Sequence, residues 1–256
     1  MYLIYKKIIK IINLKTNSLI NYFYYTANPK FINPINYLRK KREKLSIRKL
    51  KEINNGELFE LINELLLKSN STGCEFSDFY ALWQSINKFK PNCILECGSG
   101  ISTIIFAYYS HIFNGKEIKV YTVEENEYYY KDLLKNFPEQ FKKYVDFLLL
   151  ERKEKIYKGI LGSYYSNLPN KNYDFIYIDG PTDRAVWNDK SYPKTFNSDL
   201  INILSVNKNI VINGVLDQRI TTYKAFKNLI NKNRLCYNSV HKLTYITSLS
   251  HKDLID

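Results

Sequence analysis

A short apolar run leads directly into a glycine-rich turn at residues 92–103, where the sequence is NCILECGSGIST. The apolar residues predict a buried strand, and a helix is expected to start near Ile101. Gly98 and Gly100 permit backbone angles that are closed to other residues, and they allow a ligand to approach the chain closely. A strand, a glycine turn and a helix in this order predict a ligand site at the carboxyl end of a strand in an α/β sheet.

After this turn the chain alternates between short apolar runs and helical stretches. We expect strands at residues 93–95, 118–123, 144–150, 175–178 and 210–212, and helices near residues 101–112, 125–136, 195–205 and 221–231. The tail from Leu235 to Ser248 predicts a closing antiparallel hairpin. The pattern is typical of an α/β, Rossmann-like fold with a doubly wound, mostly parallel sheet, here of seven strands.

The first part of the chain is strongly basic. Residues 1–51 contain thirteen Lys or Arg residues and one acid, Glu43, so they carry nearly all of the net charge of +13. Residues 2–14 predict an amphipathic helix, which lies on a membrane surface or packs against its own domain or a second subunit. Pro29 and Pro34 predict a helix-free connector after it.

Two amphipathic helices are expected between this basic segment and the glycine turn. Residues 57–68 place Leu58 and Ile62 on one face, and residues 79–89 repeat apolar side chains at helical spacing before Pro91. We divide the chain into a basic, mainly helical extension (1–55) and one α/β domain (56–256), with leading helices at 57–90 and a ligand-binding core at 91–256.

Composition excludes several classes of protein. The four Cys residues lack the CxxC spacing of a zinc site, and His is scarce, with three residues. The sequence contains neither a signal peptide with a cleavage site nor an apolar run long enough to span a bilayer. We therefore expect a cytoplasmic protein, or one peripheral to the inner face of the membrane.

Glu96, two residues before the first glycine of the turn, restricts the choice of ligand. A dinucleotide fingerprint would need a small residue at the position of Thr103, and a P-loop would need a Gly-Lys pair that is missing here. A carboxylate at position 96 is unfavourable for a pyrophosphate but suits an amino group. S-adenosylmethionine carries both an ammonium and a sulfonium.

Three motifs carry a resemblance to a known family. ECGSGIST resembles the first motif of class I S-adenosylmethionine-dependent methyltransferases, in its E-x-G-x-G form with a following Ser-Thr. VYTVE at 120–124 resembles the second strand of that family, and YDFIYIDGP at 173–181 resembles the fourth strand of its small-molecule and glycan methyltransferases. The resemblance spans about residues 74–220, and it implies the fold, the cofactor and the activity of that family.

The resemblance also implies roles for the matched residues that would bind S-adenosylmethionine. They are Glu96, Gly98, Ser99, Gly100, Ser102, Thr103 and Glu124. Glu124 would accept hydrogen bonds from the ribose hydroxyls. Alternatively, Glu124 and Glu125 stabilise the next helix through its dipole, and Ser102 and Thr103 only begin their helix.

Asp179 would end the fourth strand and face the transferred methyl group. It is the candidate general base or substrate contact, although a turn-forming role is the alternative. Asp183, Arg184 and Asp217 are candidate substrate contacts, and Arg184 could pair with an acidic sugar or a phosphate. Asp179 and Asp217 could instead hold a divalent metal, which we do not predict.

The sequence therefore predicts a methyltransferase that O-methylates a sugar hydroxyl of a surface glycan or its precursor. Residues 1–51 could contact a membrane surface, or a second copy of the chain in a homodimer. One alternative is a nucleic-acid methyltransferase whose basic segment contacts phosphates, but the motifs for amino or cytosine methylation are missing. The other alternative is a non-catalytic binding module that keeps the cofactor fold.

Overall fold

The computed structural model describes residues 32–70, 75–113, 118–187, 190–192, 194–238 and 242–255. The helix expected at residues 2–14 lies outside these ranges, so it stays a prediction. Among the described residues, no helix combines the length and the apolar character needed to cross a bilayer.

A seven-stranded sheet forms the centre of the molecule, with the strand order β11-β12-β10-β6-β1-β2-β3. Its strands are β1 (Cys93–Cys97), β2 (Lys119–Glu124), β3 (Val145–Leu149), β6 (Phe175–Ile178), β10 (Val211–Leu216), β11 (Leu235–Asn238) and β12 (Leu243–Ser250). The pairs within β10-β6-β1-β2-β3 are parallel, whereas β12 is antiparallel to both β10 and β11. The predicted mostly parallel sheet with a C-terminal hairpin is confirmed.

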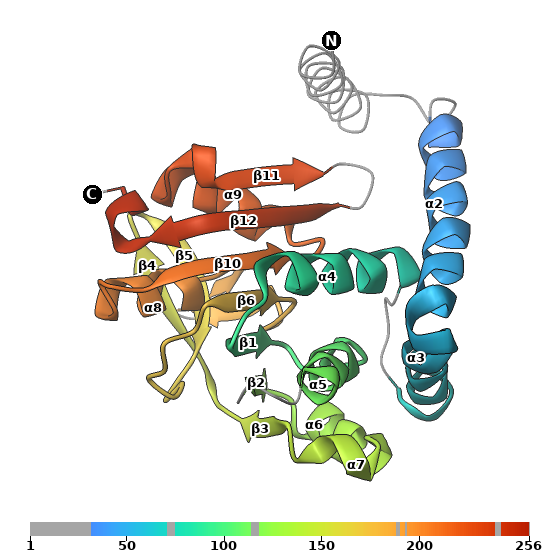
Figure 1. The fold of residues 1–256 in the computed structure, drawn as a ribbon. Helices are drawn as coiled ribbons and strands as arrows, with labels where there is room; N and C mark the ends of the chain where they lie inside the picture. Colours follow the sequence, from blue (N-terminus) through green and yellow to red (C-terminus); the bar gives the residue numbers. More distant parts are fainter. Residues whose placement is uncertain are drawn as a thin grey trace.

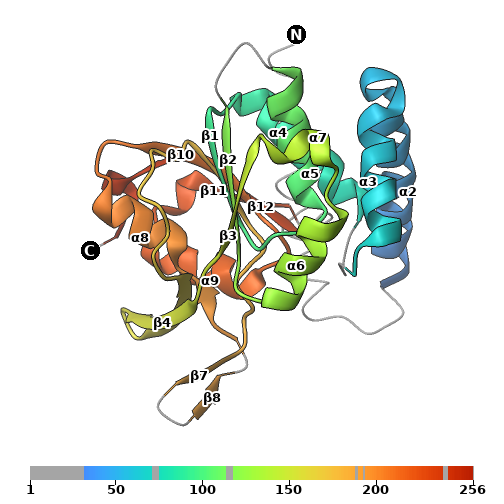
Figure 2. The same ribbon diagram turned by 90° about the horizontal axis from the view of Figure 1, so that it is seen from below.

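Helices cover both faces of this sheet (Figure 2). One face carries α4 (Phe76–Phe89) and α5 (Ser102–Ile112), and the other carries α8 (Asp199–Val206) and α9 (Ile220–Leu229). The helices α6 (Glu127–Asn136) and α7 (Glu139–Lys142) follow β2. The fully buried neighbours Ile94 and Leu95 of β1 belong to opposite hydrophobic clusters, because successive side chains of a strand point to opposite faces.

Two helices precede α4 and stand together at one side of the domain (Figure 1). They are α2 (Ile32–Glu52) and α3 (Glu57–Lys68), joined by the short helix η2 (Ile53–Gly56). Asn54 and Asn55 have left-handed φ angles of 41° and 56°, which break the helical path at the predicted boundary near residue 55. Pro34 lies inside the first turn of α2, so the predicted connector at residues 28–37 is wrong from residue 32 onward, while its part around Pro29 lies outside the described residues. A proline is tolerated in a first turn because the N–H groups there have no partner within the helix.

Glu43, the one acid among residues 1–51, attaches α2 to the domain. Its two carboxylate oxygens accept hydrogen bonds from the backbone N–H groups of Phe76 and Ser77, each at 2.8 Å. These groups belong to the first turn of α4, which otherwise lacks a side-chain cap. Leu50 of α2 is fully buried in the same core as α4. From residue 32 onward, the basic extension therefore packs against the α/β domain.

Smaller elements lie outside the seven-stranded sheet. The strands β4 (Arg152–Tyr157) and β5 (Ile160–Tyr165) form an antiparallel hairpin that pairs with β9 (Phe196–Asn197), and β7 (Ala185–Trp187) pairs with β8 (Lys190–Tyr192). Two short helices, η3 (Lys232–Arg234) and η4 (His251–Asp253), flank β11 and β12. The sequence patterns did not predict these additional strands.

Candidate active site

A cleft of about 800 Å³ opens at the carboxyl ends of β1, β2, β6 and β10. Open α/β sheets bind their ligands at this position, because the loops after the strands diverge there. The loop after each of these four strands contributes to the lining, and the N-terminal part of α4 closes one side. The predicted ligand site after β1 is therefore part of a larger cavity.

The glycine turn after β1 packs directly against the turn after β6. Gly98 has a φ angle of +91°, which favours glycine, and a Cβ atom built there would come within 2.5 Å of the backbone nitrogen of Gly180. A Cβ atom on Gly180 would in turn lie 2.6 Å from the Cα atom of Gly98. Two glycines are thus needed for the two turns to meet at the base of the cleft.

Glu96 lies behind this turn and is fully buried. Its carboxylate accepts hydrogen bonds from the hydroxyls of Ser102 at 2.5 Å, Thr103 at 2.6 Å and Thr122 at 2.7 Å. Burial raises the pKa of Glu96 to about 7, although the three hydrogen bonds act in the opposite direction. Glu96 and Thr103 do not line the cleft, contrary to the direct ligand contact expected from the sequence, because these hydroxyls hold the carboxylate inside the domain.

Glu124 ends β2 and lines the cleft from its second strand. The backbone N–H groups of Ser99 and Asn126 donate to its carboxylate at 3.2 Å and 2.9 Å, so the glycine turn and the end of β2 are in contact. Burial, followed by the neighbouring carboxylate of Glu125, raises the pKa of Glu124 to about 7. The cap of α6 is the side chain of Asn126, which accepts from the N–H of Tyr128 at 2.9 Å.

Glu125 has a different role from its neighbour. Its carboxylate accepts hydrogen bonds from the hydroxyl of Tyr165 at 2.9 Å and from the backbone N–H of Thr182 at 2.8 Å. It therefore connects the end of β2 to β5 and to the loop that follows β6. The sequence analysis assigned the cofactor role to Glu124 alone and did not predict this bridging role of Glu125.

Asp179 follows β6 and presents an accessible carboxylate to the cleft, with 49% of its side chain exposed. A guanidinium nitrogen of Arg219 lies 3.5 Å from its Oδ1 atom, and a second nitrogen of Arg219 donates to the carbonyl of Pro181 at 2.6 Å. The protein atoms around the cleft raise the pKa of Asp179 to about 6, whereas Arg219 lowers it. The carboxylate is thus held in place by an arginine and still open to a ligand.

Two further carboxylates lie beside Asp179. Asp217 follows β10, Asp78 belongs to α4, and their exposed fractions are 8% and 6%. One oxygen of each carboxylate has no hydrogen-bond partner, and Gln218 donates to the other oxygen of Asp78 at 3.3 Å. Burial raises the pKa of Asp78 to about 7, with a further contribution from Glu75, and it raises the pKa of Asp217 well above its ordinary value.

The cleft brings together most of the residues that the sequence singled out. They are Gly98, Ser99, Gly100, Ser102, Glu124, Asp179, Asp183 and Asp217. Arg184 is exposed and does not line the cleft. Asp78 and Arg219 were missed. Arg219 lies two residues after Asp217 in the loop expected after a strand, which could have indicated it, whereas nothing in the sequence connects Asp78 to the cleft.

Within the described part of the chain, no group of three or more His, Cys, Asp or Glu side chains has an arrangement that could hold a metal ion.

Comparison with known structures identifies the fold. No family model matches the sequence, and no curated protein matches it. A Staphylococcus aureus structure assigned as a caffeoyl-CoA O-methyltransferase has a TM-score of 0.51 and 15% identity, over 81% of this chain and 99% of that one. A Klebsiella pneumoniae structure assigned as an O-methyltransferase has a TM-score of 0.51 and 13% identity, over 83% of this chain and 99% of that one. The chain therefore has the Rossmann-like fold of the O-methyltransferases.

Proposed function

We propose that this protein is an S-adenosylmethionine-dependent methyltransferase that acts on a hydroxyl group of a small molecule. One observation carries the proposal: the glycine turn, Glu124 and an accessible Asp179 line a single cleft at the carboxyl ends of the parallel strands. Fold alone does not determine activity, so the proposal depends on these side chains.

In this proposal the cofactor lies over the ends of β1 and β2. Glu124 binds the ribose hydroxyls, because its carboxylate oxygens face the cleft and can accept hydrogen bonds from hydroxyl donors. Gly98, Ser99, Gly100 and Ser102 contact the rest of the cofactor. Glu96 and Thr103 act as positioning residues, since Thr103 also accepts a hydrogen bond from the N–H of Gly100 at 3.2 Å. The acidic cleft suits the sulfonium and the ammonium of S-adenosylmethionine.

Methyl transfer is an in-line displacement that depends on positioning. S-adenosylmethionine would supply the methyl group: the acceptor oxygen would form a bond to the methyl carbon as the bond from that carbon to sulfur broke, which would leave S-adenosylhomocysteine. The hydroxyl proton passes to Asp179, which is ionised at neutral pH with a pKa of about 6. Arg219 positions this carboxylate.

A sugar hydroxyl of a glycan or its precursor is the acceptor that we propose, because the motif after β6 resembles that of glycan and small-molecule methyltransferases. The caffeoyl-CoA O-methyltransferase assignment of a similar structure also supports a small-molecule acceptor. A nucleic acid is disfavoured, since its phosphates would be repelled by the carboxylates of the cleft. The accessible Asp179 argues against a non-catalytic binding module.

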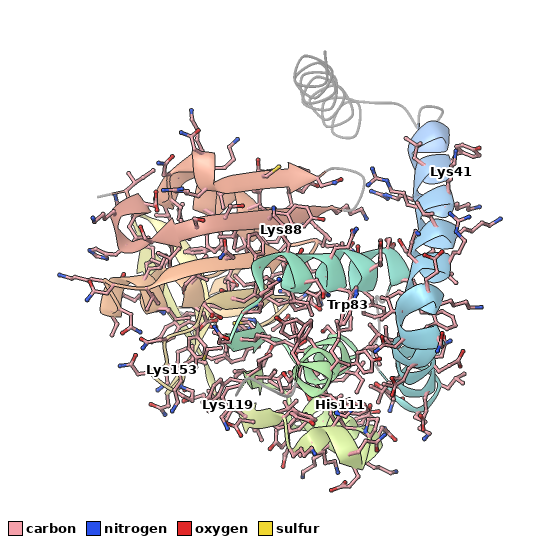
Figure 3. The ribbon with its side chains drawn as sticks, in the orientation of Figure 1. Lys41, Trp83, Lys88, His111, Lys119 and Lys153 are labelled. Carbon is pink, nitrogen blue, oxygen red and sulfur yellow. The ribbon has the colours of Figure 1, made fainter. Side chains whose placement is uncertain are left out.

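Exposed basic side chains on α2 support a peripheral contact with an anionic membrane surface. Lys40, Lys41, Lys44 and Arg48 are all exposed on this helix. Lys41 lies at the side of the molecule away from the sheet (Figure 3). Basic residues near an anionic lipid surface each contribute about 1 kcal/mol to binding.

Calorimetric titration of the full chain with S-adenosylmethionine tests the proposed function. The parent is expected to bind, and Glu124→Ala is expected to weaken binding by at least about tenfold, since it removes charge-assisted hydrogen bonds. Asp146→Ala is the matched control, because Asp146 is an exposed acid on the neighbouring strand β3 outside the cleft. A folded parent that does not bind would refute the proposal. Release of S-adenosylhomocysteine with a panel of sugars then identifies the acceptor.

A further inference from the structure

The charge of the cleft is opposite to that of the chain. Among the described side chains that line it, seven are acidic and two are basic, Lys194 and Arg219. The whole chain, in contrast, has a net charge of +13. A cavity with this balance attracts cations and repels anions, and its low-dielectric walls strengthen the effect.

Two of these acids follow strands that are not neighbours in the sheet. Glu124 follows β2, and Asp217 follows β10, with β1 and β6 between them. At about 4.8 Å between neighbouring strands, the ends of β2 and β10 lie about 14 Å apart. The proposed cofactor site occupies the half near Glu124. The half near Asp217 and Asp78 lies beyond Asp179 and is left for the acceptor.

The acceptor half holds hydrogen-bonding capacity that the described residues do not use. Asp78 is 6% exposed and Asp217 is 8% exposed, so both residues are more than nine-tenths buried. One carboxylate oxygen of each residue has no hydrogen-bond partner. A buried carboxylate oxygen without a partner destabilises the folded protein, because it has lost its hydrogen bonds to water without replacing them. The nearby cation, Arg219, makes its ion pair with Asp179 and its hydrogen bond with the carbonyl of Pro181.

We propose that Asp78 and Asp217 form a subsite for a positively charged amino group of the acceptor. The inference rests on the proposed function, which assigns the other half of the cleft to the cofactor. An ammonium has three donors and no acceptor, and its positive charge favours the ionised form of a neighbouring acid, so it complements the one oxygen of Asp78 and the one oxygen of Asp217 that have no partner. The acceptor class is then an amine-bearing molecule, such as a sugar with a free amino group. An acidic or phosphorylated sugar does not fit.

Pairs of probes that differ in the charge of one group test the subsite. Binding to the full chain, saturated with S-adenosylhomocysteine, is measured at pH 7 by ligand-observed NMR for glucosamine against glucose and for tyramine against 4-ethylphenol. In at least one pair, the amine is expected to bind about tenfold more tightly, a typical gain for a charge-assisted contact. Asp78→Asn and Asp217→Asn are each expected to remove most of that preference, whereas Asp146→Asn keeps it.

Several outcomes would overturn the subsite. They are equal binding of the charged and neutral members of both pairs by the parent, and an amine preference that both Asn variants retain. A third is stabilisation of the parent by Mg²⁺ alone that depends on Asp217 and displaces the amine. Calorimetry with S-adenosylmethionine is performed on the same protein preparations before S-adenosylhomocysteine is added. If S-adenosylmethionine does not bind, the proposed function is refuted. The preference for the amine probe is then measured on the protein without cofactor, and the same outcomes decide whether the subsite exists.

Discussion

Gly98 and Gly180 lie so close together that neither position has room for a Cβ atom. The built Cβ of Gly98 would come within 2.8 Å of the Cα atom of Gly180, and that of Gly180 would come within 2.4 Å of the hydroxyl of Tyr165. Backbone atoms cannot move aside as the end of a flexible side chain can. The contact therefore joins the turns after β1 and β6 into one unit at the base of the cleft.

We expect Gly98→Ala to lower the free energy of unfolding by about 2–4 kcal/mol, because it combines backbone strain with overpacking. Urea denaturation measures this loss. Gly159→Ala is the matched control, since Gly159 also has a positive φ angle, +79°, but a Cβ atom there would meet nothing within 4 Å. Its loss is expected to be about 1 kcal/mol, from strain alone. Equal losses for the two variants would contradict the importance of the Gly98–Gly180 contact.

Asp179→Asn is expected to lower kcat by about 10²–10⁴-fold with the acceptor found by the sugar screen, because the amide cannot take the hydroxyl proton. The affinity for S-adenosylmethionine is expected to stay close to that of the parent. For the parent, the rate should rise with pH through about 6 and then level off, since only the ionised carboxylate acts as a base. An Asn variant with the parent's rate and pH profile would show that Asp179 has no such role.

The free energy of unfolding is expected to fall as the pH rises from about 5 to 8. Burial raises the pKa of Glu96 from an ordinary 4.5 to about 7, so the folded state binds a proton more tightly than the unfolded state. Such a group contributes its full stability below the unfolded pKa and loses it as the pH rises through the folded pKa. Thermal unfolding across this range measures the trend, and Glu96→Gln should make it shallower. A variant as pH-dependent as the parent would mean that Glu96 does not titrate in this window.

Replacement of Lys40, Lys41 and Lys44 by Gln is expected to reduce cosedimentation with vesicles that contain phosphatidylglycerol, because it removes three exposed positive charges from α2. Vesicles of phosphatidylcholine alone are the control for charge-independent binding. Binding of S-adenosylmethionine should be unchanged, since none of the three side chains lines the cleft. Sedimentation of the variant at the level of the parent would refute a membrane contact through these lysines.

The sheet was predictable from the sequence because its central strands are short, strongly apolar runs. The prediction for β6 has the bounds of the structure, but those for β1 and β10 stopped too early, at residues 95 and 212. In both cases a polar residue whose side chain accepts hydrogen bonds continues the strand. Glu96 is bound by three hydroxyls, and Asn213 accepts from the N–H of Ser248 at 2.9 Å. The hairpin of β4 and β5 was missed because β4, RKEKIY, is mostly charged.

The half of the cleft that we propose for the cofactor was more predictable than the half that we propose for the acceptor. Gly98 and Glu124 each lie directly at the end of a strand, so their local sequence indicates their position. Asp78 reaches the cleft only because α4 packs beside β10, which is a contact between segments far apart in the chain. The burial of Glu96 behind the turn depends on Thr122 of a neighbouring strand, which no local pattern reveals.

The attachment of α2 through Glu43 has a mechanical consequence. Its carboxylate binds the N–H groups of Phe76 and Ser77, and the next residue along α4 is Asp78, on the acceptor side of the cleft. A force that draws α2 toward a surface would therefore act on the same helical turn that holds Asp78. The N-terminal helix α2 and the part of the cleft near Asp78 are thus connected through a single turn of helix.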